Sequence, residues 1–492
     1  MIPDRPDRAR RRSISAGIAL SGIASMLLAS CGDGSGGTPP APAPAPTPTP
    51  TPSPAPSPAP SGLFVNPAPD TASDKASAFV GWTATAGATG YIVRYSIDGG
   101  AVAQVTLGPV TGTQLVNLPA GSQVSVTIAA ISATGTSADS PPVAATLPRP
   151  ATAGETASYA NAAAYSDSKQ GEAVVVMRYG RVVYSHYTSG YANTAHALAS
   201  GSKSFSCALE GFAEQDGLLA LTDRASSVIT DWQSDPDKSK ITVLDLLSLQ
   251  SGLTGNPAYL PLTASTLDTY QLAVTETDSY APGQAFVYDP LSFQNFAMIF
   301  QLRSGGGYGG NGQVTGGTDP VDYLQTKLFT PLGIPASAYG WGRDAKNHPQ
   351  MAGGASFAAT DWLKYGQFAL QRGTWQSNRL LPAATIDYCT GGYKNPAFLG
   401  YGVTWWLNAH TAGTYDPAID RVPGDAVPVG TADQFAPDAP ADMYMAAGAG
   451  FERLYVVPSL GLVVVRFAPI GSAVTVSWSD NTFLGKLIGT LP

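Results

Sequence analysis

The sequence predicts a mixed α/β protein with two folded parts, an all-β sandwich at residues 62–150 and a domain of helices and strands at 155–490. Its 492 residues exceed the roughly 100 to 200 of one ordinary domain. Short alternating apolar runs, separated by turn residues, recur in the first part and are typical of a β-sandwich. The second part mixes strand-like apolar runs with apolar residues at helical spacing.

The composition excludes several classes of function. Hydrophobic residues make up 44% of the chain and charged residues 13%, which is enough for a sizeable core. The net charge is −8, and no Lys/Arg cluster follows Arg12, so we do not expect nucleic acid as a partner. Four His and three Cys, without a CxxC or HExxH spacing, predict no metal site, and no motif predicts a cofactor.

The N-terminus resembles a bacterial lipoprotein signal over residues 1–30. A basic stretch ending at Arg12 precedes an apolar run that ends in Leu28-Ala29-Ser30-Cys31. This run is shorter than the roughly 20 apolar residues that a membrane-spanning helix requires. The resemblance implies that Cys31 carries a lipid that anchors the protein to a membrane.

Gly32, rather than Asp, after the lipidated position favours the outer membrane, so we expect a bacterial cell-envelope protein on a periplasmic or surface face. Residues 31–61 form the predicted linker. Within it, Thr38–Pro60 is almost entirely Pro alternating with Ala, Thr or Ser, which favours an extended, semi-rigid stalk.

The all-β part resembles a fibronectin type III domain across residues 62–150. The resemblance rests on three features that follow one another along the chain: a Trp, a Tyr-containing strand and a Leu-Pro turn. No set of residues in it could perform chemistry, so we interpret it as a spacer or docking module. The strand-like runs are Ala78–Trp82, Tyr91–Tyr95, Val102–Leu107 and Val124–Ala130.

Two Ser-x-x-Lys patterns occur in the second part. Ser166–Lys169 precedes the strand-like run Ala173–Met177, so it would lie near a helix end, and we interpret it as solvated surface. Ser200-Gly201-Ser202-Lys203 is followed by apolar residues at helical spacing and then by Asp216-Gly217, a plausible helix stop. This pattern places Ser200 and Lys203 on the first turn of a buried helix.

A serine and a lysine one turn apart can form a nucleophile and its base. A helix N-terminus and burial both disfavour the ammonium form of Lys203, and an uncharged amine can accept a proton. One turn brings that amine within reach of the Ser200 hydroxyl. Ser200 is therefore the candidate nucleophile and Lys203 the candidate base.

The segment Ser200–Phe205 resembles the nucleophile motif of the serine β-lactamase and penicillin-binding-protein superfamily, in its class C-like branch. The resemblance implies an antiparallel sheet flanked by helices, with a helical subdomain. Pro282–Tyr288 resembles the second motif and implies that Tyr288 relays a proton beside Ser200 and Lys203. The strand Tyr444–Gly450 resembles the third motif, and implies that the amides of Ser200 and Ala449 form the oxyanion hole.

Two departures point away from β-lactams. β-Lactamases carry Asn or Ser where this chain has Pro290, and a cationic motif where it has Ala446-Ala447-Gly448. The strand instead resembles the carboxylesterase and 6-aminohexanoate-dimer hydrolase branch, except that the usual Gly-Gln reads Phe451-Glu452. Glu452 or Arg453 would then either tune the site or be solvated.

The sequence therefore predicts a serine hydrolase that acts on a small ester or amide through an acyl-enzyme. A β-lactamase or D-alanyl-D-alanine carboxypeptidase is one alternative, and a non-catalytic envelope binding protein is another. The natural substrate and the oligomeric state stay open.

Smaller features of the sequence allow further predictions. The Gly-rich insertion 305–317 predicts a mobile loop, and a second insertion spans 409–442. Cys207 and Cys389 form either a disulfide or two buried thiols. The four histidines lack the motifs of a Ser-His-Asp hydrolase, so we expect them on polar surface or in local hydrogen bonds.

Overall fold

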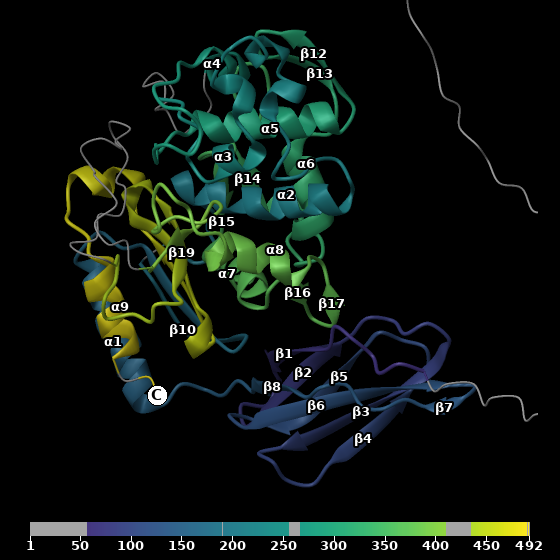
Figure 1. Cartoon of the computed structure of the whole chain (residues 1–492). Coiled ribbons are helices and arrows are strands. Elements are labelled where there is room, and N and C mark those ends of the chain that lie inside the picture. Colours follow the sequence, from purple (N-terminus) through teal and green to yellow (C-terminus); the bar gives the residue numbers. More distant parts are fainter. Residues whose placement is uncertain (1–56, 189, 255–265, 410–433, 490, 492) are drawn as a thin grey trace, which may run out of the picture. The chain divides into compact units, whose positions relative to one another are not determined.

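The computed structural model describes residues 57–188, 190–254, 266–409, 434–489 and 491 (Figure 1). The predicted signal 1–30, Cys31 and the predicted linker up to residue 56 lie outside the described residues. Within those ranges, no helix combines the length and the hydropathy that crossing a bilayer requires.

Residues 64–146 form two antiparallel sheets. Their inward-facing side chains share one buried cluster, in which Val80, Val93 and Val126 are fully buried. The first sheet has the order β1 (Phe64–Pro69), β2 (Lys75–Gly81), β5 (Gly112–Pro119). The second has the order β4 (Ala103–Leu107), β3 (Ala88–Ile97), β6 (Gln123–Ser132), β7 (Gly135–Thr136), and β8 (Val143–Thr146) also pairs with β6. Kinship with fibronectin type III domains stays a prediction.

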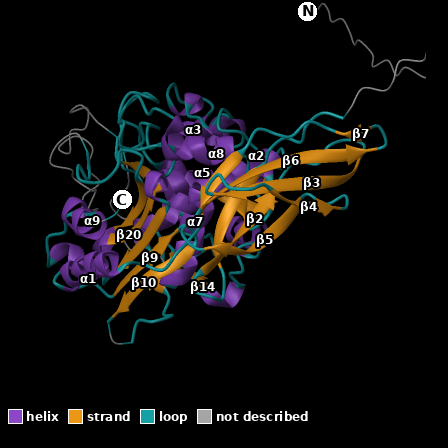
Figure 2. Ribbon diagram, turned by 90° about the horizontal axis from the view of Figure 1, so that it is seen from below, coloured by secondary structure: helices purple, strands orange, loops and turns teal. Residues whose placement is uncertain are grey.

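The second part is built on a six-stranded, wholly antiparallel sheet, as the sequence predicted (Figure 2). Its central strands are buried on both faces, which fits their nearly continuous Val and Leu runs. Strands far apart in the sequence lie next to each other in it. The order is β10 (Arg181–Tyr187), β9 (Ala173–Arg178), β21 (Leu462–Phe467), β20 (Glu452–Val457), β19 (Tyr444–Gly448), β18 (Trp406–Leu407).

Helices cover both faces of this sheet. On one face, α1 (Ala153–Asp167) packs beside α9 (Asp480–Ile488), and Arg466 of β21 points toward α1. Val463, three residues earlier on the same strand, points to the opposite face and contacts α7 (Ala359–Leu370). Helix α1 begins with a capping box between Thr152 and Glu155.

The other helices pack on one another (Figure 1). They are α2 (Phe205–Gln215), α3 (Val243–Leu247), α4 (Thr269–Thr275), α5 (Leu291–Arg303), α6 (Pro320–Leu324) and α8 (Ala383–Asp387). A small sheet of β11 (His196–Ala197), β15 (Ala355–Phe357) and β14 (Tyr339–Trp341) and a hairpin of β16 (Thr374–Trp375) and β17 (Asn378–Arg379) complete this part.

The Gly-rich insertion is a β-hairpin rather than the loop that the sequence predicted. Its strands are β12 (Gly306–Gly310) and β13 (Gln313–Gly316). The Tyr308 hydroxyl donates a hydrogen bond to Asp231, and the Asn311 amide donates another at 2.9 Å. These long-range contacts supply the order that the local sequence lacks. The predicted insertion 409–442 lies mostly outside the described residues.

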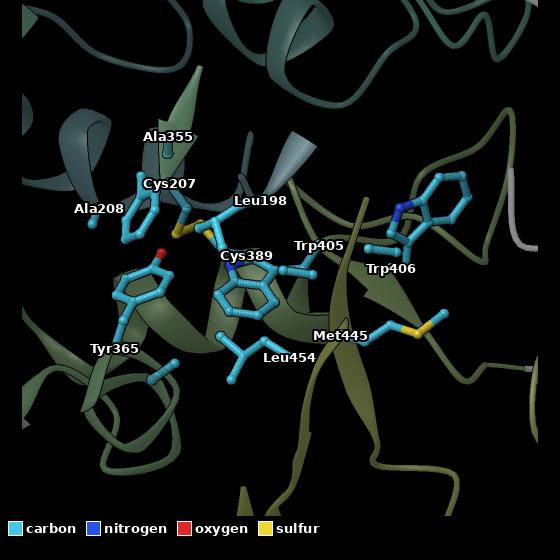
Figure 3. Close-up of a cluster of buried hydrophobic side chains, with 14 of the residues drawn as sticks. Leu198, Cys207, Ala208, Ala355, Tyr365, Cys389, Trp405, Trp406, Met445 and Leu454 are labelled. Carbon is cyan, nitrogen blue, oxygen red and sulfur yellow. A yellow bond between two sulfur atoms is a disulfide. The ribbon is translucent and has the colours of Figure 1, made fainter. Parts of the chain in front are cut away.

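Cys207 and Cys389 form a disulfide, so the alternative of two free thiols is wrong (Figure 3). Cys207 lies on α2, directly after the turn that carries Ser200. Cys389 lies in the helical turn Tyr388–Gly392 that follows α8, 182 residues away in the sequence. The bond therefore fixes the nucleophile helix against a distant segment of the chain.

Glu210 is a buried carboxyl on α2 whose replacement by Gln should stabilise the protein at neutral pH. It is 1% exposed, and its Oε1 atom has no hydrogen-bond partner among the described residues. Burial, with a smaller contribution from Glu214, raises the pKa of Glu210 to about 8. Between its ordinary pKa near 4.5 and 8 the folded state holds more protons than the unfolded state, so stability falls as the pH rises.

Chemical denaturation across pH 4 to 8 tests this. We expect the stability gained by Glu210→Gln to grow from near zero at pH 4 to about 3 kcal/mol at pH 7. Glu214→Gln, on the exposed face of the same helix, is the matched control and should change stability little. A gain for Glu210→Gln that does not vary with pH would contradict the assignment.

Candidate active site

Ser200 and Lys203 lie on one short 3-10 turn, Ala199–Ser204, that leads into α2. The Lys203 Nζ atom lies 2.8 Å from Ser200 Oγ and 2.9 Å from the carbonyl oxygen of Ala352, within hydrogen-bond distance of both. Ser200 is 8% exposed and Lys203 2%. The spacing of the Ser-x-x-Lys pattern thus places the Lys203 amine at hydrogen-bond distance from the Ser200 hydroxyl, and both side chains are buried.

Hydrogen bonds hold this turn from several sides. The Ser202 hydroxyl donates to the carbonyl of Ala199 at 2.7 Å and accepts from the amide of Ala355 at 3.0 Å. The hydroxyl of Tyr365 on α7 donates to the carbonyl of Ser204 at 2.6 Å (Figure 3). Ala199 has a φ of +46°, a region that residues with a side chain rarely adopt and that a well-held functional turn can maintain.

Tyr288 lies beside the lysine. The Lys203 Nζ atom is 4.9 Å from the centre of the Tyr288 ring and 5.6 Å from the centre of the Phe293 ring. The Tyr288 ring stacks on Trp406 at 5.5 Å and is 3% exposed. The fold therefore brings together the three side chains that the sequence singled out, from segments up to 88 residues apart.

Asp289 is a residue of this site that the sequence reasoning missed. Its carboxylate is fully buried and caps α5, accepting hydrogen bonds from the amides of Leu291 (2.8 Å) and Ser292 (2.7 Å) and from the Ser292 hydroxyl (2.7 Å). Burial raises the pKa of Asp289, and the hydrogen bonds and the nearby Lys203 partly offset the rise. An Asp-Pro pair before an apolar helix was the available signal.

Aromatic rings pack around Tyr288. Phe286 contacts Phe398 at 4.9 Å and Tyr401 at 5.5 Å, and Tyr401 meets Trp406 edge to face at 4.8 Å. Phe435 contacts Trp406 at 5.6 Å. We call this group the aromatic cluster. Its members other than Phe435 are buried, and the cluster packs against the Tyr288 ring and holds it in place.

The end of β19 lies against the nucleophile turn. A Cβ atom on Gly448 would lie 2.1 Å from the carbonyl oxygen of Leu198 and 3.2 Å from the Cβ atom of Ala199. After Gly448 the chain enters a 3-10 turn, Ala449–Phe451. Ala449, the predicted second oxyanion donor, therefore begins this turn. The end of β19 just before it contacts the residues that precede Ser200.

A profile of the Beta-lactamase family matches residues 160–468, well over half of the chain. The chain belongs to the beta-lactamase family. The match covers the nucleophile turn, Tyr288 and the strands β19, β20 and β21. No curated protein matches the sequence.

Solved structures resemble the chain at low sequence identity. A Bacillus anthracis protein assigned as a 6-aminohexanoate-dimer hydrolase is 16% identical, with 66% of this chain and 79% of that chain covered and a TM-score of 0.50. A hydrolase with promiscuous acyltransferase activity is 15% identical (68% and 97% covered, TM-score 0.49), and a class C β-lactamase is 17% identical (69% and 96%, 0.46). At 16% identity, the likeness to the Bacillus anthracis protein shows the fold alone.

Two expectations of solvent exposure were wrong. Of the two alternatives for Glu452 and Arg453, the solvated one is excluded, because these residues are only 1% and 2% exposed. Ser166, placed on solvated surface because its Ser-x-x-Lys pattern lies at a helix end, is also buried, and its hydroxyl accepts a hydrogen bond from Arg466. In each case a partner distant in the sequence compensates for burial of the polar group.

One group of side chains in the described ranges could in principle hold a cation: Asp268, Asp344 and His348. Burial alone would raise the pKa of Asp344, but hydrogen bonds from His348 and Thr269 outweigh it and lower the pKa to about 2. The His348 Nδ1 atom lies 3.1 Å from Asp344, and its ring stacks on Tyr270. Because these groups already satisfy one another, we interpret the cluster as structural.

The other histidines also make local contacts. His196 is buried, with Nδ1 3.0 Å from Glu172, and its ring stacks on Phe467. His186 lies at hydrogen-bond distance from Asp167. His410 lies outside the described residues. These three contacts tie neighbouring elements together.

Proposed function

We propose that the chain is a serine hydrolase that cleaves carboxylic esters or amides through an acyl-enzyme. The 2.8 Å contact between Lys203 Nζ and Ser200 Oγ, on a buried turn, is the observation that carries the proposal. An amine at this distance can take the hydroxyl proton as the oxygen attacks a carbonyl carbon. The short helical turn fixes the geometry without help from the substrate.

The reaction proceeds in two halves. Ser200 Oγ bonds to the substrate carbonyl carbon while its proton passes to Lys203, and the carbonyl π electrons move onto the oxygen. The amides of Ser200 and Ala449 stabilise this oxyanion. When the carbon–oxygen or carbon–nitrogen bond breaks, the alcohol or amine leaves with the proton, relayed through Tyr288. Water then attacks the acyl-enzyme by the reverse transfers and releases the acid and Ser200.

The residues around the site favour a neutral ester or amide over a β-lactam. Pro290 cannot supply the side-chain amide or hydroxyl found at that position in β-lactamases. Ala446 to Gly448 is buried and carries no cation that could meet a β-lactam carboxylate.

Covalent labelling tests the proposal. We expect a fluorophosphonate to label the protein, p-nitrophenyl butyrate to be hydrolysed, and both activities to be lost in Ser200→Ala. The control is Ser168→Ala, an exposed serine of the other Ser-x-x-Lys segment, which should keep both. Labelling that survives in Ser200→Ala would refute the nucleophile.

The same assay separates the alternatives. Hydrolysis of nitrocefin or penicillin labelling of Ser200, without ester turnover, would replace the proposal by a β-lactamase or carboxypeptidase. Failure of every acylating probe would favour a non-catalytic binding protein. The lack of a cation at Ala446 to Gly448 argues against the first outcome, and the buried serine–lysine pair argues against the second.

We further propose that the protein is held at the cell envelope by lipid on Cys31. The basic and apolar leader and the small residues before Cys31 support this, as does the Pro-rich segment that would space the folded part from the membrane. Incorporation of labelled palmitate that persists in Cys31→Ser would contradict it.

A further inference from the structure

We infer that two buried arginines, Arg453 and Arg466, are positioning residues that aim the Ala449 amide into the oxyanion hole. The inference rests on the proposed function and identifies which groups hold one of its parts in place. Arg453 on β20 and Arg466 on β21 are direct cross-strand partners, and both are buried. Like charges directly opposite each other destabilise a sheet, so such a pair needs a compensating set of partners.

Arg453 acts on the peptide group that contains the Ala449 amide. Its Nη1 atom donates to the carbonyl oxygen of Gly448 at 3.1 Å and to that of Glu452 at 3.0 Å. The carbonyl of Gly448 and the N–H of Ala449 belong to one planar peptide group and point in opposite directions when it is trans. Fixing the carbonyl therefore fixes the direction of the N–H.

The other end of the Arg453 guanidinium is anchored to α9. Its Nε atom lies 2.8 Å from Asp480 Oδ1, an oxygen that also accepts hydrogen bonds from Tyr455 (2.5 Å) and Trp478 (3.0 Å). The planar guanidinium thus bridges a fixed carboxylate and the Gly448 peptide. Its positive charge at the carbonyl oxygen also polarises the peptide, which strengthens the N–H as a donor.

Arg466 holds the rest of the same turn. Its Nη1 atom donates to the carbonyls of Gly450 and Phe451, both at 3.0 Å. Its Nη2 and Nε atoms reach the carbonyl of Lys169 (2.8 Å) and the hydroxyl of Ser166 (3.1 Å). The Ser472 hydroxyl donates a second hydrogen bond to the Gly450 carbonyl at 2.8 Å.

The turn needs this support because its backbone is strained. Gly450 has a φ of +80° and Phe451 a φ of +65°, and Phe451 carries a side chain that disfavours this region. A strained turn of this kind persists only where the surroundings determine it. Four carbonyl groups from Gly448 to Glu452 accept hydrogen bonds from the two guanidinium groups. These hydrogen bonds hold the turn in its conformation and fix the direction of the amide at its start.

Arg453→Lys tests the inference on the full chain, because an ammonium keeps the charge beside Asp480 but cannot bridge to the Gly448 carbonyl as well. We expect kcat for p-nitrophenyl butyrate to fall roughly 10- to 100-fold with KM changed less than threefold, since an oxyanion donor acts in the transition state. Fluorophosphonate should still label Ser200 to completion, more slowly.

Arg178→Lys is the matched control. Arg178 is buried in the same sheet and forms an ion pair with Glu155 at 2.9 Å. It lies on β9 opposite Leu462, which is at the other end of β21 from Arg466. We expect it to lower the melting temperature as Arg453→Lys does while leaving kcat unchanged. Arg466→Lys and Ser472→Ala, which loses a single hydrogen bond to the turn, provide further variants if Arg453→Lys does not fold.

A thionoester substrate separates aiming of the amide from a general loss of structure. Sulfur accepts hydrogen bonds poorly, so the oxyanion donors contribute little to the hydrolysis of a thionoester. The preference of the protein for the oxygen ester should therefore shrink in Arg453→Lys and stay unchanged in Arg178→Lys. Equal kcat and equal preference in the two variants would overturn the inference alone. Absence of labelling and turnover in the unaltered chain would overturn the proposed function, and the inference with it.

Discussion

Replacing Lys203 by Met should lower kcat/KM for p-nitrophenyl butyrate by roughly a thousandfold or more, because it removes the base from the nucleophile. Met has nearly the length of Lys and is apolar, so it can occupy the space between the Tyr288 and Phe293 rings. We therefore expect the variant to fold. Steady-state kinetics and the rate of fluorophosphonate labelling measure the effect.

Lys203→Arg is the sharper variant because it puts a permanent cation in the place of an amine that can be uncharged. A guanidinium does not lose its proton in proteins, so it cannot serve as the base, and we expect a comparable loss of activity. Lys240→Met, at an exposed position, is the control and should leave activity unchanged. If Lys203→Arg retained more than a tenth of the activity, the lysine would act through its charge and the proposed proton transfer would be wrong.

The nucleophile turn could be predicted from the sequence because its geometry is local. Ser200 and Lys203 are three residues apart, and the apolar residues that follow them on α2 specify a buried helix. The strands could be predicted for the same reason, since the run of Val and Leu in β21 favours a buried strand whatever lies beside it.

The groups that support the site could not be predicted because their partners are distant in the sequence. Arg466 and Ser166 are 300 residues apart, and nothing near either residue indicates the other. Buried arginines also run against the general expectation that charged residues are exposed. Only the assembled sheet and the two helices α1 and α9 supply the acceptors that make burial of Arg453 and Arg466 tolerable.

The disulfide illustrates the same limit. Cys207 and Cys389 could each be expected to be buried, but their pairing depends on how α8 packs against α2, which the sequence does not reveal. The Gly-rich hairpin depends likewise on Asp231, a residue more than 70 positions away that accepts its hydrogen bonds.

Gly448→Ala should reduce kcat by roughly a hundredfold or more, because the added methyl group cannot be accommodated where β19 meets the nucleophile turn. The new Cβ atom would lie 2.1 Å from the carbonyl oxygen of Leu198, a backbone atom that cannot rotate away. The strand end or the turn must move, and either movement separates the Ala449 amide from Ser200. Kinetics and thermal unfolding report the two consequences, and Gly154→Ala, where no atom lies closer than 4.0 Å, is the control.

A double variant identifies which contact is responsible. Ala199→Gly removes the Cβ atom that would lie 3.2 Å from the new methyl group but leaves the Leu198 carbonyl in place. We therefore expect Ala199→Gly to give Gly448→Ala no recovery of kcat. Recovery to the level of Ala199→Gly alone would place the obstruction at the side chain and show that the two backbones can separate without loss of the site. Full activity in Gly448→Ala itself would mean that the close approach of β19 to the nucleophile turn is not needed for catalysis.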